Sequence, residues 1–130
     1  MISGGVMLTI RTEQMSIFSK RRQHAFERHL VELVRIHWPD VYGSRDVENI
    51  LQMVRRAKLR AQSHGLTTAA DVARYLNLSL LLGDSFDADP GLPWVRHFLD
   101  DVTIRPEARL QRLCAFASRH LAEEEEVLHA

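Results

Sequence analysis

The chain has 130 residues, with 17 lysines and arginines against 17 aspartates and glutamates, and a single cysteine, Cys114. This length suits one compact domain, and 45% apolar with 26% charged residues is typical of a folded, soluble protein rather than a disordered one. One cysteine cannot close a disulfide within the chain. That excludes the disulfide-stapled secreted class and agrees with a reducing compartment.

The N-terminal sequence shows no targeting signal. Residues 1–7 lack the cationic start and apolar run of a signal peptide, and the longest apolar stretch, 78–82, is far shorter than the ~20 residues of a membrane span. We therefore expect a cytoplasmic protein with no membrane partner. Residues 1–8 are expected to be a flexible lead, with an extended arm over Met7–Ile10, and either Met1 or Met7 is the native start.

Hydrophobic periodicity predicts a first helix from Thr12 to the residue before Pro39. The apolar positions recur at helical steps, at Met15, Phe18, Ala25, Phe26, Leu30, Leu33 and Val34. Thr12 is a suitable N-cap, and Glu13 suits the positive end of the helix dipole. Residues Tyr42–Ser44 are expected to form a loop after this helix.

A second helix is predicted from about Ser44 or Asp46 to just before Gly65, with one apolar and one basic face. A third follows Thr67 or Thr68, either of which can cap it, and ends at Gly83. Because the third helix is apolar on more than one side, we expect it at the centre of the domain.

The segment Asp84–Pro93 holds three aspartates, two prolines and one glycine, so it is predicted to be a long loop between the third and fourth helices. A short fourth helix is expected over Trp94–Leu99 and a fifth from Pro106 to about Leu121, followed by an acidic tail over 123–130. No stretch alternates as a strand would. The predicted fold is all-α, a compact single-domain bundle of about five helices over residues 1–130.

The residues that usually carry catalysis form no recognised pattern. His24 and His29 are five apart and lack the spacing of a helical zinc site. The aspartates of the loop do not follow an EF-hand, since the twelfth residue from Asp87 is Phe98 and not glutamate. Cys114 lies on an apolar stripe, which indicates packing. We predict no catalytic residue, no metal site, no cofactor and no small-molecule substrate, with a metal-dependent enzyme as a lesser alternative.

Charge is distributed unevenly along the chain. Residues 11–62 carry 11 basic and 6 acidic side chains, whereas residues 63–130 carry 6 basic and 11 acidic ones. Basic residues cluster on the first predicted helix and, as Arg55, Arg56, Lys58 and Arg60, on the second. One alternative is therefore a small nucleic-acid-binding regulator that uses the basic face of the second helix. The zero net charge favours a different interpretation, in which the two halves attract each other within the fold.

Three stretches carry a family resemblance: Thr9–Met15 (TIRTEQM), His64–Leu76 (HGLTTAADVARYL) and Gly83–Trp94 (GDSFDADPGLPW). They resemble small helical bacterial proteins encoded beside type VI secretion spike and effector genes, some of which act with a chaperone in loading an effector onto the spike. The resemblance covers the chain from Met7 to about Leu121. It implies an intracellular adaptor or co-chaperone that binds a secretion effector, its chaperone or both, and it supplies no catalytic residues.

Exposed aromatic and arginine side chains are the residue types enriched where proteins dock. The residues predicted to contact a partner are Trp38, Tyr42, Arg55, Arg56, Arg74, Phe86 and Trp94. Among the aromatic members, Trp38 and Tyr42, beside Pro39 and Gly43, are expected to be exposed. Arg74 lies one helical turn after Asp71, so the two are expected to form a local ion pair.

Overall fold

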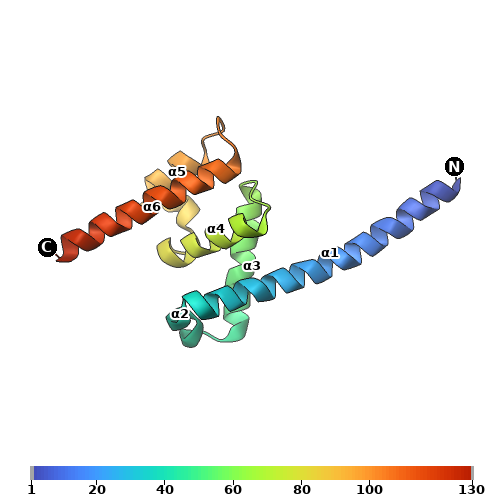
Figure 1. The fold of residues 1–130 in the computed structure, drawn as a ribbon, viewed down its shortest axis with the longest axis horizontal. Helices are drawn as coiled ribbons and strands as arrows, with labels where there is room; N and C mark the ends of the chain where they lie inside the picture. Colours follow the sequence, from blue (N-terminus) through green and yellow to red (C-terminus); the bar gives the residue numbers. More distant parts are fainter. Residues whose placement is uncertain (1, 130) are drawn as a thin grey trace. The chain divides into compact units, whose positions relative to one another are not determined.

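The computed structural model describes the backbone of residues 2–129 and the side chains of residues 20–124. Within this range the chain forms six α-helices and one 3₁₀ turn and no strand, which confirms the all-α prediction with one helix more than expected (Figure 1). The helices are α1 Ile2–His37, α2 Pro39–Ser44, α3 Val47–Ser63, α4 Ala69–Leu82, α5 Pro93–Leu99 and α6 Pro106–His129, with the 3₁₀ turn η1 at Phe86–Ala88.

The start of α1 corrects the sequence analysis. The extended arm predicted over Met7–Ile10 is wrong, because residues 2–11, which include the expected lead, are helical and continuous with the rest of α1. Each of the two glycines in this segment disfavours a helix by about 1 kcal/mol relative to alanine. Extending an existing helix is nevertheless much less costly than nucleating a new one, so the helix continues through them.

The loop predicted over Tyr42–Ser44 is also wrong, since these residues form the end of α2. Pro39 occupies the first turn of α2, where the missing backbone N–H of proline costs nothing. Trp38, which precedes the proline, leaves helical geometry at φ −131° and ψ 58°. A single proline therefore ends α1 and starts α2.

Local signals placed α3, α4 and α5 close to their predicted bounds. Helix α6, predicted to end at about Leu121, instead continues to His129 through the segment that was predicted to be an acidic tail. Asp46 accepts a hydrogen bond from the backbone N–H of Asn49 at 2.8 Å ahead of α3. The Thr68 hydroxyl accepts one from the N–H of Asp71 at 3.2 Å and caps α4. Gly65 and Gly83 follow these helices with φ of +80° and +113°, values that favour glycine.

The chain divides into two compact units, one up to Gln52 and one from Met53 onward, with the division inside α3. This division is finer than the single domain expected over residues 1–130. In the N-terminal unit α1 contacts α2, and its buried apolar side chains among the described residues are Leu30, Val34 and Ile50.

The C-terminal unit contains the larger core. Helix α4 contacts α6 and η1, and α5 contacts α6 and η1. The buried apolar side chains include Val72, Tyr75, Leu76 and Leu78 of α4, and they are joined by Phe86, Val95, Leu99, Leu110, Leu113 and Ala117. The third predicted helix, α4, contributes buried side chains to this core, but α6 is the helix that contacts both α4 and α5, and Leu81 of α4 is exposed. Fully burying such side chains stabilises a fold by about 1.5–3 kcal/mol each.

Candidate functional site

The predicted partner-binding residues fall in both units and differ in exposure. In the N-terminal unit Trp38 and Tyr42 are half-buried. In the C-terminal unit Arg56 and Arg74 are exposed, whereas Arg55 and Trp94 are half-buried. Within the C-terminal unit, the set therefore includes both exposed and partly buried side chains.

Trp94 belongs to a cluster of aromatic rings on α5 and α6. Its ring centroid lies 5.0 Å from that of Phe116 and 5.4 Å from that of His120, and Phe98 lies 5.4 Å from Phe116. Phe116 and His120 stack with an interplanar angle of 14°. All four side chains are half-buried. We call Trp94, Phe98, Phe116 and His120 the aromatic patch.

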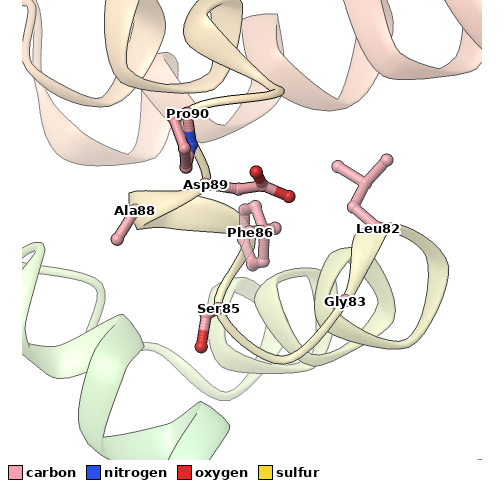
Figure 2. A pocket seen from close by; sticks show the side chains of 7 residues that line it. All are labelled: Leu82, Gly83, Ser85, Phe86, Ala88, Asp89 and Pro90. Carbon is pink, nitrogen blue, oxygen red and sulfur yellow. The ribbon is translucent and has the colours of Figure 1, made fainter.

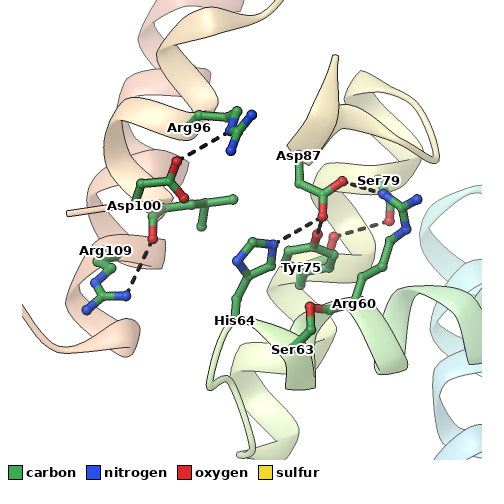
Figure 3. Close-up of polar contacts among 10 residues, drawn as sticks. Arg60, Ser63, His64, Tyr75, Ser79, Asp87, Arg96, Asp100 and Arg109 are labelled. Carbon is green, nitrogen blue, oxygen red and sulfur yellow. Dashed lines mark hydrogen bonds and ion pairs between the residues drawn. The ribbon is translucent and has the colours of Figure 1, made fainter. Parts of the chain in front are cut away.

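Helical spacing creates this patch. Trp94 and Phe98 are four residues apart on α5, and Phe116 and His120 are four apart on α6, so each pair lies on one side of its helix. The two helices lie side by side (Figure 1). Arg109 of α6, which is labelled in Figure 3, fixes the connection between them. It donates to the backbone oxygens of Ile104 at 2.8 Å and Leu99 at 3.4 Å.

Phe86 does not belong to any exposed surface. Its side chain is only 1% exposed, and its ring lies 4.9 Å from the ring of Tyr75, which is fully buried. The prediction that Phe86 contacts a partner therefore applies to a side chain that is almost fully buried, where an apolar ring stabilises the core. The sequence analysis placed it in a loop, and the 3₁₀ turn η1 directs it inward.

Next to Phe86 in the chain, the carboxylate of Asp87 contacts three polar side chains (Figure 3). The Tyr75 hydroxyl donates to Oδ2 of Asp87 at 2.8 Å, His64 Nε2 lies 3.1 Å from the same oxygen, and the Arg60 guanidinium pairs with Oδ1. The donors come from α3, the segment after it and α4. We call Arg60, His64, Tyr75 and Asp87 the Asp87 network.

The network sets the protonation states of Asp87 and Tyr75. Burial alone would raise the pKa of Asp87, but the hydrogen bonds from His64 and Tyr75 and the charge of Arg60 outweigh it and hold that pKa below its usual value. Burial, followed by the hydrogen bond to Asp87, raises the pKa of the Tyr75 hydroxyl far above its usual value. Asp87 is thus held as a carboxylate and Tyr75 as a neutral donor.

The contacts of the network attach η1 to α3 and α4. A nucleophilic triad needs a hydroxyl or thiol against the histidine. Among the described side chains, the contact of His64 is with Asp87, and the Ser63 hydroxyl donates to the backbone oxygen of Arg60 at 2.6 Å. Burial, with a smaller contribution from Asp71, raises the pKa of the half-buried Cys114 thiol, which disfavours the reactive thiolate.

Within residues 20–124, no three histidine, cysteine, aspartate or glutamate side chains lie close enough together to hold a metal ion.

The basic residues of α3 make contacts inside the C-terminal unit. Arg56 pairs with Asp84 at 2.9 Å, Arg60 pairs with Asp87, and Lys58 is only 8% exposed. Arg55 also has an interaction within the structure. These residues do not form the single exposed basic face that nucleic-acid binding by this helix requires. The attraction expected between the basic and acidic parts of the sequence is confirmed for the two arginines.

Arg74 behaves as its position predicted. It donates to the carboxylate of Asp71, one turn earlier on α4, at 2.9 Å. The Asp71 side chain is 5% exposed and that of Arg74 is 48% exposed, so the pair joins the core of the unit to its surface.

A hollow of about 300 Å³ lies at the start of the Asp/Pro-rich segment (Figure 2). Its lining residues are Leu82, Gly83, Ser85, Phe86, Ala88, Asp89 and Pro90. Sequence reasoning missed both this hollow and the Asp87 network. A partial signal existed, because His64, Tyr75 and Asp87 all lie in the stretches that carried the family resemblance.

Comparison of the chain with protein-family models, curated proteins and solved structures found no match. Over the described residues, none of the helices has both the length and the apolar character required to cross a bilayer.

Proposed function

We propose that this protein is a non-catalytic adaptor or co-chaperone that binds a type VI secretion effector, or the chaperone of that effector, in the bacterial cytoplasm. The resemblance of three sequence stretches suggests the secretion system. The aromatic patch is the structural observation that carries the binding role, because it presents two phenylalanines, a tryptophan and a histidine that remain half-exposed in the folded unit.

The composition of the aromatic patch suits a protein partner. Large aromatic side chains give much contact area for little loss of side-chain entropy, and they are enriched among the residues that dominate binding energy. The patch lies on two helices whose connection Arg109 fixes, so its rings are already arranged before a partner arrives. The Asp87 network supports the same role by attaching η1 to α3 and α4.

The test is affinity purification of the tagged protein from its own host. We expect the wild-type protein to recover an effector or effector chaperone in near-stoichiometric amounts, and Phe116→Ala to recover at least fivefold less. Val102→Ala is the matched control, because Val102 is an apolar residue of the same unit that is 82% exposed and lies outside the patch. Recovery of nucleic acid alone, or of nothing at any salt concentration, would contradict the proposal.

A further inference from the structure

The three aspartates of the segment Asp84–Pro93 have different partners. Asp84 pairs with Arg56 at 2.9 Å and Asp87 pairs with Arg60, so the chain itself neutralises two of the three charges. Asp89 accepts a hydrogen bond from the backbone N–H of Gly91 at 2.8 Å. Within the part of the chain whose side chains the structure describes, no cationic side chain pairs with Asp89.

The Asp89 carboxylate lines the hollow described above, and Figure 2 shows it directed into the space between Leu82 and Phe86. The other side-chain walls are mainly apolar, from Leu82, Phe86, Ala88 and Pro90. The hollow therefore combines an apolar surface with one negative charge that has no cationic partner among the side chains of residues 20–124. Its volume of about 300 Å³ lies at the lower end of the range for ligand pockets, so it suits a single side chain better than a cofactor.

We infer that this hollow binds a basic side chain, arginine or lysine, presented by a protein partner. Such side chains have an aliphatic stem that packs on apolar surface and a cationic end that pairs with a carboxylate. The stem would lie on Leu82 and Pro90 while the cation pairs with the Asp89 oxygen atoms. An anionic ligand would be repelled by Asp89. The inference rests on the proposed function for the source of the side chain, but not for the chemistry of the hollow.

The test uses two probes that differ in charge alone, N-acetyl-arginine amide and N-acetyl-citrulline amide, titrated into the full-length protein and followed by backbone amide NMR shifts. Citrulline keeps the stem and the planar end group of arginine but is neutral. We expect shifts at Gly83, Ser85, Ala88 and Asp89, with millimolar affinity for the arginine probe at least fivefold above that for the citrulline probe.

Two variants locate the effect. Asp89→Asn removes the charge but retains the side-chain oxygen that accepts a hydrogen bond from the Gly91 N–H, so the turn is kept. The arginine and citrulline probes are then expected to bind this variant with about equal affinity. Asp84→Asn is the matched control and should leave the preference unchanged. Leu82→Ser should weaken both probes, because it removes part of the apolar wall.

Shifts centred elsewhere, or an arginine preference that survives in Asp89→Asn, would overturn the inference. A failure of this titration alongside recovery of an effector from the host would overturn the role of the hollow and leave the adaptor proposal standing. Binding of the arginine probe at Asp89 without any recovered partner would support the role of the hollow and contradict the adaptor proposal.

Discussion

The C-terminal unit contains two groups of aromatic rings, each with one histidine, and they differ in burial. Tyr75 and Phe86 are fully buried, whereas both histidines and the rings of the aromatic patch are only partly buried. In the Asp87 network Tyr75 is fully buried against Phe86, and the polar ends of Tyr75 and His64 are bound to Asp87. In the aromatic patch all four side chains are half-buried. Similar residue types therefore stabilise the core around Asp87, whereas in the aromatic patch they keep part of their surface accessible to a partner. What separates them is the partly buried carboxylate of Asp87, which accepts hydrogen bonds from the polar groups of the first.

The largest effect is expected from Phe86→Ala. Truncating a fully buried phenylalanine removes its transfer free energy and leaves a cavity beside Tyr75, so the free energy of unfolding should fall by about 3–5 kcal/mol. Urea unfolding followed by far-ultraviolet circular dichroism measures this change. Val102→Ala, at a position 82% exposed, should change stability little. A loss below about 1 kcal/mol for Phe86→Ala would mean that Phe86 is not part of the core.

A smaller effect is expected from Tyr75→Phe, which keeps the ring and removes only the hydroxyl that donates to Asp87. Hydrogen bonds to charged groups contribute about 1.5–3 kcal/mol, and the variant should lose that amount. A double-mutant cycle with Asp87→Asn separates this contact from changes in packing. A coupling energy of zero would show that the two side chains do not interact in solution.

The network also predicts how stability depends on pH. Because the pKa of Asp87 is lower in the folded than in the unfolded protein, its carboxylate stabilises the fold fully above about pH 4 and loses this effect as the pH falls further. The difference in the free energy of unfolding between the wild type and Asp87→Asn should therefore shrink as the pH falls below about pH 4. A constant difference down to pH 2 would contradict a lowered pKa.

At alkaline pH, the stability of the protein is expected to depend on the ionisation of Tyr75. The raised pKa of Tyr75 means that its neutral hydroxyl stabilises the fold fully below about pH 10 and that this contribution declines as the pH rises above that value. The stability difference between the wild type and Tyr75→Phe should decline over the same range, as measured by urea unfolding at pH 8 to 11. An unchanged difference at pH 11 would argue against a neutral, buried Tyr75.

The smallest stability effect is expected from Phe116→Ala in the aromatic patch. Truncating a partly buried ring is expected to cost about 1 kcal/mol, because such a ring removes less apolar surface from water than a fully buried one. The same variant is expected to cause the largest loss of partner recovery. Unfolding and affinity purification of Phe116→Ala and Phe86→Ala, measured side by side, would show whether the two ring groups separate stability from binding. Equal losses of stability would remove the distinction.

Much of the helical structure could be predicted because its signals are local. Thr68 and Asp46 cap α4 and α3 through residues three positions away, and Gly65 and Gly83 take positive φ directly after those helices. The ion pair of Asp71 and Arg74 was predictable for the same reason. Two errors of local structure come from competing local preferences. Two glycines near the start of α1 do not interrupt that helix, and Pro39 starts α2 where a loop was expected to follow α1.

The candidate site was less predictable, because its contacts join distant parts of the chain. Asp87 meets Tyr75 at a separation of 12 residues, His64 at 23 and Arg60 at 27. A sequence shows that three aspartates lie in one segment, but not that Asp84 and Asp87 have arginine partners while Asp89 has none. The burial of Phe86 depends on the same long-range packing.

The sequence by itself determined the all-α class and the ends of α3 and α4, since helical periodicity and capping act over a few residues. Tertiary structure alone decided which charges are neutralised and which rings remain exposed, because burial and ion pairing depend on the packing of helices that are far apart in the chain. Asp89 and the aromatic patch owe their availability to that packing.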